Sequence, residues 1–362
     1  MRNILGNNLT VTLFGESHGE QIGAVIDGLC AGIEINYEHI NDVLKRRRPG
    51  KTDTARIELD NYKIVSGVYN GYTTGEPVCI LIENKNTQSD DYESIKNTPR
   101  PGHADYAVYM KNDGYNDYRG GGHTSGRITT PICLVGSILE SQLNKKGIKI
   151  ATHILEIGNV KDQKFSLNNL EEQIDIVNSR DIPLIDDLQE EVAKQILNAK
   201  NNQNSIGGVI ETVISGLPCG IGDPWFSSFE GTIANAVFSI GGVKGIEFGE
   251  GFAFKDLLGK VANDEFYYDN GLVKTKTNHN GGVNGGITNG MPVVFRCAIK
   301  PTPSISQIQE TINLQTKENT TIVVKGRHDS AIIRRICIVI SMITSIVVAD
   351  MLTMEYGRKY LK

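Results

Sequence analysis

The sequence has few cysteines and no excess of positive charge, and both shortages exclude classes of protein. Its six cysteines show no Cys-x-x-Cys spacing and lie mostly in apolar runs, so buried free thiols are expected and neither zinc ligation nor disulfides are predicted. The formal net charge of −5 provides no basic field that would recruit nucleic acid or an anionic membrane. Any anionic ligand must therefore be held by a local cluster of cations.

Long hydrophobic segments are also missing. The N-terminus lacks the apolar core of a secretion signal, which predicts a cytoplasmic protein. Near the C-terminus, residues 336–349 are uncharged, but this stretch is shorter than the roughly 20 residues that a membrane-spanning helix requires. A buried helix is predicted there, and no membrane association is expected.

Glycine, in contrast, is abundant. The chain of 362 residues contains 39 glycines, which cluster at 120–122, 241–251 and 281–286. Because glycine lets the backbone approach a ligand closely, this clustering predicts loops that cradle a ligand. The hydrophobic fraction of 39% is ordinary for a globular protein.

Short apolar runs and helical patterns follow one another without the regular strand–helix rhythm of a Rossmann or barrel fold. The predicted strands are 9–14, 23–29, 78–82, 207–215 and 291–299, and the predicted helices are 37–47, 131–146 and 329–356. A polar region at 158–204 contains two amphipathic helical patterns and is expected to lie on the surface. The pattern alone supports a mixture of α and β structure without a recognisable domain boundary.

The most informative segment is Gly15-Glu-Ser17-His18-Gly19, directly after a predicted strand. A serine and a histidine side by side between glycines place two proton-handling groups in a loop that can approach a ligand. This layout is typical of an active-site loop, although a solvated turn with one histidine is the alternative.

Two more blocks have the same character. Residues 120–127 read Gly-Gly-Gly-His-Thr-Ser-Gly-Arg, and residues 325–331 read Lys-Gly-Arg-His-Asp-Ser-Ala. Together with the first block, and in this order, they resemble the three sequence motifs of the chorismate synthases. Segments 46–50, 100–106, 239–245 and 300–305 also resemble parts of that family. The resemblance runs from about residue 9 to about residue 350, essentially the whole chain.

The resemblance implies one α+β domain over residues 1–362, a β-α-β sandwich with helices between two sheets, assembled into a homotetramer. It also implies a carbon–oxygen lyase of aromatic amino acid biosynthesis. Chorismate synthases convert 5-enolpyruvylshikimate 3-phosphate into chorismate and phosphate by a 1,4-anti elimination, and they require reduced FMN. A reduced flavin can lend electron density to the departing phosphate and then recover it.

A basic run at residues 45–48 ends a predicted helix. Alone, such a run is more often a solvated face or a helix C-terminus, but further arginines stand in glycine-rich or histidine-containing contexts. Arginine forks suit carboxylate and phosphate groups, and the implied substrate carries both. The expected substrate-binding residues are Arg46, Arg47, Arg48, Arg100, Arg127 and Arg335.

The resemblance also implies catalytic roles. His18 would act on the leaving phosphate, and His103 would face the N1/C2 region of the flavin and stabilise its charge. Asp329 would accept or relay the proton from flavin N5, supported by the hydroxyls of Ser17 and Ser125. The alternatives are a structural loop histidine for His18 and a helix N-cap for Asp329.

For FMN, the resemblance points to glycine-rich and cationic positions. Lys300 is expected to neutralise the FMN phosphate, and glycine backbone amides are expected to lie against the ring system. The implied cofactor set is His123, Thr124, Ser125, Gly241, Gly242, Gly285, Lys300, Pro301, Thr302, Pro303, Ser304 and Arg327. Of the remaining histidines, His39 and His153 are expected to be structural, and His279 is a candidate for the flavin pocket.

Four departures from the family are visible. Many members have Arg at His123, Asn-Ala or Pro-Ala at Gly241-Gly242, and an acidic residue at Ser341, so the flavin contacts at 241–242 and any ion pair at 341 are in question. The segment 51–53 also differs from relatives that carry a basic residue there. No nicotinamide-binding motif is recognisable, which predicts an external flavin reductant.

Two alternatives come from other functional classes. One is a flavin-independent phosphate lyase or phosphohydrolase that uses His18 and the arginines, although no metal-ligand set stands at usable spacing. The other is an RNA-binding protein that uses residues 45–51, although the acidic charge balance and the lack of interleaved aromatics oppose it.

Overall fold

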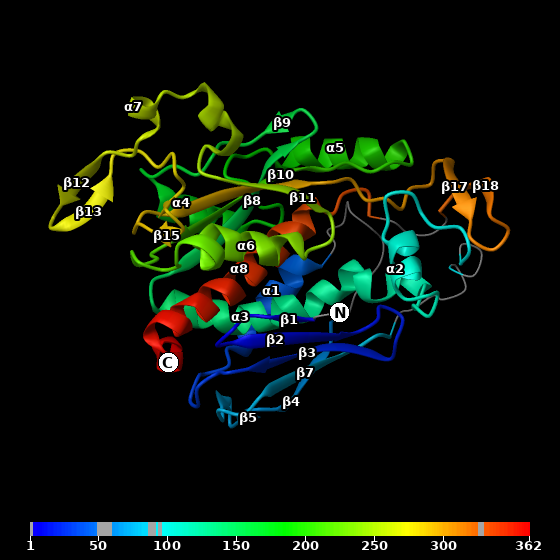
Figure 1. Cartoon of the computed structure of the whole chain (residues 1–362), viewed down its shortest axis with the longest axis horizontal. Coiled ribbons are helices and arrows are strands. Elements are labelled where there is room, and N and C mark those ends of the chain that lie inside the picture. The colour runs from blue at the N-terminus through cyan, green and yellow to red at the C-terminus, as the bar shows by residue number, and fades with distance from the viewer. Residues whose placement is uncertain (1–2, 49–59, 86–91, 93–95, 325–328) are drawn as a thin grey trace.

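A computed structural model describes residues 3–48, 60–85, 92, 96–324 and 329–362. Two five-stranded sheets enclose a layer of long helices (Figure 1). Within each sheet every pair of neighbouring strands is antiparallel. This architecture confirms the predicted α+β fold with helices between sheets.

The first sheet has the order β1-β2-β3-β7-β4 and carries the first motif at the end of β2. Alternate residues of β7, namely Val78, Ile80 and Ile82, are buried against the helical layer, as expected for a strand with one covered face. The strands of this sheet are β1 (Ile4–Leu5), β2 (Thr10–Gly15), β3 (Gln21–Asp27), β7 (Val78–Glu83) and β4 (Tyr62–Ser66).

The second sheet has the order β11-β16-β10-β8-β9. Its strands are β11 (Val243–Phe248), β16 (Val293–Ile299), β10 (Gly208–Ser215), β8 (Lys149–Ile157) and β9 (Val160–Lys161). Four two-stranded ribbons complete the strands: β5 (Val68–Tyr69) with β6 (Tyr72–Thr73), β12 (Phe266–Asp269) with β13 (Leu272–Thr275), β14 (Val283–Asn284) with β15 (Ile287–Thr288), and β17 (Gln309–Asn313) with β18 (Glu318–Ile322).

The helical layer contains α1 (Tyr37–Arg47), α3 (Thr129–Lys145), α6 (Phe229–Phe238) and α8 (Ile333–Tyr356) (Figure 1). Helix α3 crosses α8 closely at Gly136, where an added Cβ would lie 2.5 Å from the Cβ of Met342. The shorter helices are α2 (Asp105–Lys111), α7 (Gly259–Ala262), η2 (Arg119–Thr124), η3 (Gly126–Ile128), η4 (Trp225–Ser227), η5 (Gly251–Asp256) and η6 (Arg358–Leu361).

Helix α8 is the predicted buried helix, but it begins at Ile333 rather than at residue 329. Its 24 residues are long and apolar enough to cross a membrane by length and composition, yet its most apolar window is completely buried inside the protein. The sandwich itself therefore accounts for its hydrophobicity.

The polar region at 158–204 contains two helices, as predicted. Helix α4 (Leu170–Ser179) buries one apolar face in a small separate cluster with Ala151 of β8 and Val213 of β10. Helix α5 (Gln189–Asn201) buries Val192 and Ile196 and exposes most of its other side chains.

Candidate active site

The first motif is fastened to the second at the end of β2. The main-chain N–H of Ser17 donates to the carbonyl of Gly122 at 3.1 Å, and the Ser17 hydroxyl donates to the carbonyl of Arg119 at 3.2 Å. The same hydroxyl lies 3.1 Å from Nδ1 of His18. The ring of His18 packs edge-on against Tyr92, with centroids 5.1 Å apart.

The glycines of the second motif lie against two histidines from different segments. A Cβ on Gly120 would stand 2.2 Å from Cε1 of His18, and a Cβ on Gly121 would stand 3.0 Å from Cε1 of His103. Both glycines also have positive φ, at 61° and 92°, which side-chain-bearing residues rarely adopt. The run 120–121 therefore brings a bare stretch of backbone against both histidine rings.

His103 is held by a carboxylate that the sequence prediction did not single out. Its Nδ1 lies 2.6 Å from Oδ1 of Asp105, and Asp105 in turn accepts two hydrogen bonds of 2.8 Å from the guanidinium of Arg100. Burial opposes the ionisation of Asp105, but the hydrogen bonds from Arg100 and His103 outweigh it and hold the pKa of this carboxyl well below its usual range.

Arg100 itself is turned inward. It is 6% exposed, and beyond Asp105 its Nη1 donates to the hydroxyl of Ser304 at 3.1 Å. The side chain of Arg100 therefore ties Ser304 to His103, while its predicted contact with substrate stays a prediction.

The predicted cofactor segments converge at the same place. Nζ of Lys300 donates to the carbonyl of Gly102, and the main-chain N–H of Lys300 donates to the carbonyl of Gly242 at 2.9 Å. Burial, together with the nearby charge of Lys244, lowers the pKa of Lys300. Pro301, Thr302 and Pro303 continue this segment, and the hydroxyl of Thr302 is buried without a hydrogen-bond partner among the described residues.

Basic residues gather where α1 ends and α8 begins. Arg47 is 1% exposed and lies 3.5 Å from the buried carboxylate of Asp60, which Arg127 also contacts. Arg335 donates to the carbonyl of Arg47 at 3.1 Å and pairs with Asp329 at 2.7 Å. Helix C-terminal carbonyls attract cations, and Arg335 fills that role at the end of α1.

The alternative of Asp329 as a helix N-cap is wrong. The N-cap of α8 is Ile332, which makes no side-chain cap, and the carboxylate of Asp329 pairs with Arg335. The neighbouring Arg334 was missed by the sequence prediction, although it donates to the carbonyl of Arg48 at 2.6 Å. Arg46 donates to Asn178 at 3.1 Å and is thereby linked to α4.

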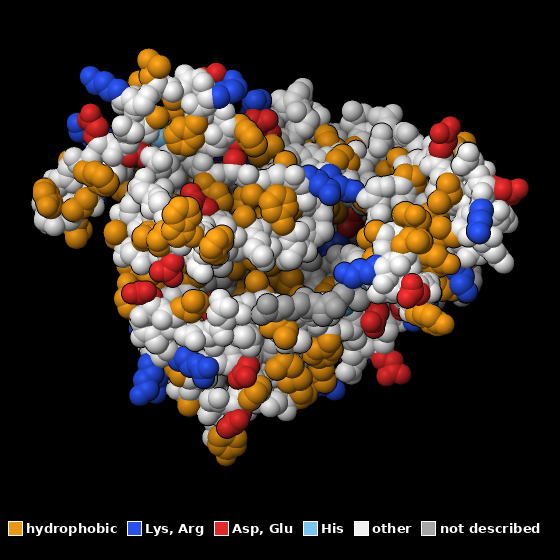
Figure 2. All heavy atoms as spheres, viewed as in Figure 1, with side chains coloured by type: hydrophobic (Ala, Val, Ile, Leu, Met, Phe, Trp, Pro, Cys, Tyr) orange, Lys and Arg blue, Asp and Glu red, His pale blue; other side chains and the backbone are white. Residues whose placement is uncertain are grey.

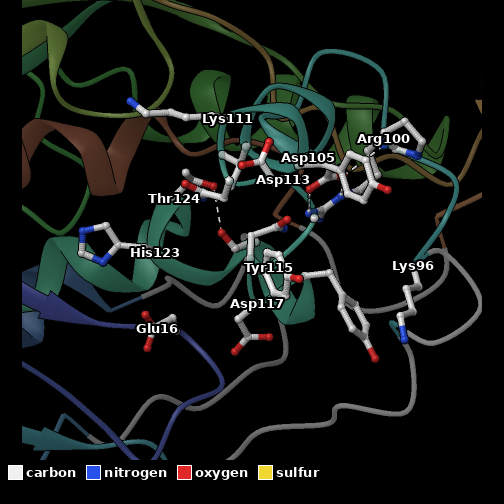
Figure 3. A pocket seen from close by; sticks show the side chains of 18 of the residues that line it. Glu16, Lys96, Arg100, Asp105, Lys111, Asp113, Tyr115, Asp117, His123 and Thr124 are labelled. Carbon is white, nitrogen blue, oxygen red and sulfur yellow. Dashed lines mark hydrogen bonds and ion pairs between the residues drawn. The ribbon is translucent and has the colours of Figure 1, made fainter. Parts of the chain in front are cut away.

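A cleft of about 730 Å³ is lined by Glu16 of the first motif, by Arg100 and Asp105, and by Gly121 of the second motif (Figure 3). His123 and Thr124 line it, with Nδ1 of His123 2.7 Å from the carbonyl of Gly15 and the hydroxyl of Thr124 donating to Gly121 at 2.8 Å. The hydroxyl of Ser125 accepts from the main-chain N–H of Arg127 at 3.3 Å. Figure 2 shows a hollow beside the α2 segment with Lys and Arg side chains at its rim.

Some predicted residues lie elsewhere. Gly285 sits in the turn between β14 and β15, next to Gly286, whose carbonyl accepts from Phe229 at the start of α6. Gly241 and Gly242 follow the other end of that helix. Gly285 therefore does not lie beside them within this chain. His279 lies 3.5 Å from Asp264, apart from His103. Arg327 and residues 49–51 lie outside the described residues.

The two histidines predicted to be structural have acidic partners in the framework. His39 of α1 lies 2.8 Å from Glu140 of α3. His153 is fully buried on β8 between Asp162 and Glu211, and these hydrogen bonds outweigh the effect of burial and raise the pKa of His153.

Ser341, at the position where the resemblance implies an acidic residue, makes a hydroxyl contact. Its Oγ donates to Thr152 of β8 at 2.8 Å, and Thr152 lies 3.0 Å from Thr212 of β10. This ladder joins α8 to the second sheet without an ion pair. In the described ranges, no group of three or more His, Cys, Asp or Glu side chains could hold a metal ion.

Comparison with known proteins gives one consistent result. The family model described as chorismate synthase matches residues 9–353. Named chorismate synthases from Korarchaeum cryptofilum and Thermococcus gammatolerans are 40% and 42% identical to this chain, over 96% and 95% of its length and 96% of each relative. A solved structure titled as the crystal structure of chorismate synthase superimposes with a TM-score of 0.77 at 27% identity, covering 97% of this chain and 94% of its own.

Proposed function

Because this chain belongs to the chorismate synthase family, we propose that the junction of His18, His103 and Gly120-Gly121 is the centre at which it forms chorismate. Members of the family are carbon–oxygen lyases of aromatic biosynthesis. The membership argues against the two alternatives considered for the sequence, an RNA-binding protein and a flavin-independent phosphate lyase or phosphohydrolase.

The observation that carries the proposal is the position of the bare glycine backbone against both histidine rings. An added Cβ would collide with His18 at one glycine and crowd His103 at the next, so the sequence keeps this strip open. Two proton-handling groups from segments 85 residues apart thus share one neighbour. His18 would donate a proton or hydrogen bond to the leaving phosphate, while His103 would place a hydrogen-bonding edge against the cofactor.

The family uses reduced flavin, and we assign FMN as the form. Three features fit such a group: the open glycine strip, the cation at Lys300, and the buried unpaired hydroxyl of Thr302. Lys300 through Ser304, His123 through Ser125 and Gly241-Gly242 would hold it, with Arg327 as a further candidate. When bound, the reduced flavin supplies electron density to the breaking C–O bond and an acceptor for the ring proton.

The chain's own groups then complete the chemistry. Asp329 would accept or relay the proton from flavin N5, and its ion pair with Arg335 orients it. Ser17 and Ser125 would support proton transfer. The hydroxyl of Ser17 contacts His18, and Ser125 is the N-cap of η3. Arg46, Arg48 and Arg335 would face the substrate anions, while the buried Arg47 and Arg127 add positive charge from behind, partly offset by Asp60.

The finer properties implied by the family are part of the same proposal. We assign 5-enolpyruvylshikimate 3-phosphate as the substrate, an external source of reduced flavin, a homotetrameric assembly and a cytoplasmic location. The source of reduced flavin is argued from the sequence, which shows no nicotinamide-binding motif.

The direct test is an anaerobic reaction of the purified chain with the enolpyruvyl substrate and chemically reduced FMN. Chorismate absorbance and stoichiometric phosphate release are expected. Phosphate release without chorismate would instead indicate a hydrolase, and full activity without any flavin would overturn the cofactor assignment.

A further inference from the structure

The sequence motifs leave Asn84 unassigned, yet its side chain joins two parts of the proposed site. Asn84 directly follows β7, which pairs with β3, the strand that leads out of the first motif. It belongs to none of the segments that resemble the family motifs. Its contacts nevertheless reach both the loop of His18 and Arg127.

The amide nitrogen of Asn84 holds the first motif from both sides. Its Nδ2 donates to the carbonyl of Glu16 at 3.1 Å and to the carbonyl of Gly19 at 2.9 Å. Ser17 and His18 lie between these two carbonyls in the sequence. One side chain therefore closes the loop that carries both groups.

The amide oxygen of Asn84 faces the cations. It accepts from Nε of Arg127 at 3.2 Å, and Arg127 pairs with Asp60, which Arg47 also contacts. The orientation of the amide is determined by its partners, because a carbonyl requires a donor and a guanidinium requires an acceptor. An inverted amide would lose all three hydrogen bonds.

We propose that Asn84 is the positioning residue that couples the buried Arg127–Asp60–Arg47 group to the loop of His18. This inference rests on the proposed function. The cations that attract the substrate anions and the histidine that acts on the phosphate must keep a fixed separation. The side chain of Asn84 hydrogen-bonds both to Arg127 and to the loop that carries His18. It acts through His18, so its loss should affect turnover more than substrate affinity.

The test is a double-mutant cycle between Asn84 and His18, measured with reduced FMN and the enolpyruvyl substrate under anaerobic conditions. Asn84→Ala is expected to lower kcat by about 10²-fold, the usual cost of misplacing a catalytic group by about 1 Å, with little change in KM. In the His18→Ala background the same substitution should cost almost nothing more, since residues that act as a unit are non-additive.

Two further variants separate positioning from general damage. Asn84→Asp keeps an acceptor for Arg127 but loses both donors to the loop, so it should be impaired like Asn84→Ala if the loop contacts matter. Asn202→Ala, at the exposed C-cap of α5, is the matched control and should behave as the parent enzyme. Thermal unfolding of every variant verifies that it is folded.

An equal loss from Asn84→Ala in both backgrounds would overturn the proposal, and so would a raised KM with unchanged kcat. If Asn84→Ala does not fold, the Asn84→Asp cycle gives the same decision. A parent enzyme that forms no chorismate would contradict the proposed function itself, which is a separate outcome.

Discussion

At the scale of single residues, the two histidines have different electrostatic surroundings. His103 stands 2.6 Å from an ionised carboxylate, Asp105, which is itself held by Arg100. His18 contacts the neutral hydroxyl of Ser17 and the ring of Tyr92. Asp105 contacts the His103 ring directly, whereas the carboxylate whose charge interacts with His18 is that of Asp117.

This difference predicts distinct defects. His18→Ala and His103→Ala should each lower kcat by about 10²–10⁴-fold, the usual worth of a positioned acid or base. His103→Ala should also change the spectrum of bound reduced FMN, whereas His18→Ala should leave that spectrum nearly unchanged and weaken its response to substrate. Stopped-flow absorbance under anaerobic conditions measures both. Matching spectra in the two variants, or a near-normal rate in either, would show that the roles are wrongly assigned.

Asp105 gives a pH-dependent prediction. Because the folded protein depresses the pKa of Asp105, its ionised form contributes stability above the unfolded value of 3.8, and this contribution is lost as pH falls through the lower folded value. Asp105→Asn should therefore lower the free energy of unfolding by about 1–3 kcal/mol at pH 7, as for a lost hydrogen bond to a charged group. Urea unfolding should show the difference between variant and parent shrinking as pH falls from about 5 towards 3. A difference that stays constant with pH would contradict this assignment.

The sequence revealed the residues that carry recognisable chemistry but not their partners. Ser17 and His18 stand out because they are adjacent and flanked by glycine. Asp60 and Asn84 do not stand out in the sequence. They contact Arg127 from 67 and 43 residues away, and these contacts depend on the order of the strands in the sheet. Asp105 is nearer to its partners but resembles an ordinary first-turn acid of α2.

At the scale of elements, the bounds of a helix were predicted accurately where a single sequence pattern determines them. Helix α1 has the predicted bounds, because its basic last turn precedes a proline. The start of α8 was predicted four residues too early, since the carbonyl of Ser330 accepts from Ile206 and Asp329 pairs with Arg335. These tertiary bonds keep the segment out of the helix.

Glycine at 136 has a role that the clustering of glycines in loops did not indicate. It lies inside α3, where an added Cβ would approach the carbonyl oxygen of Met342 on α8 to 2.6 Å. Gly136→Ala should therefore destabilise the protein by about 1–3 kcal/mol, because overpacking forces the two helices apart. Gly259→Ala is the control, as nothing lies within 4 Å of the position of its Cβ. Denaturant unfolding distinguishes them, and equal stability of both variants would contradict a close helix crossing.

At the scale of the whole molecule, the sandwich and the reaction class were predictable, while the division of the chain into domains stays a prediction. Many of the large apolar side chains that remain exposed lie between residues 225 and 273. Trp225 and Phe226 are 86% and 102% exposed, and Trp225 has a positive φ of 70°, a strained conformation for a bulky residue. Residues of this kind in the open are typical of association surfaces.

If the chain forms a homotetramer, this surface should be part of it. Trp225→Ser combined with Phe226→Ser should shift the assembly to a smaller mass in light scattering, while the fold measured by circular dichroism is retained. Tyr69→Ser, which removes an exposed aromatic from the distant β5–β6 ribbon, should not. A parent protein that is monomeric would refute the tetramer, and an unchanged mass of the double variant would place the interface elsewhere.

The source of electrons is the last property that belongs to the whole molecule. Oxidised FMN should support no turnover, because the reduced ring is the source of electron density for the departing phosphate. NADPH with FMN should also fail, since no nicotinamide-binding motif is recognisable in the sequence. Adding dithionite or a separate flavin reductase should restore chorismate formation to the rate found with reduced FMN. Sustained turnover with NADPH and FMN alone, in enzyme free of any reductase, would mean that this chain binds a nicotinamide by a surface its motifs do not reveal.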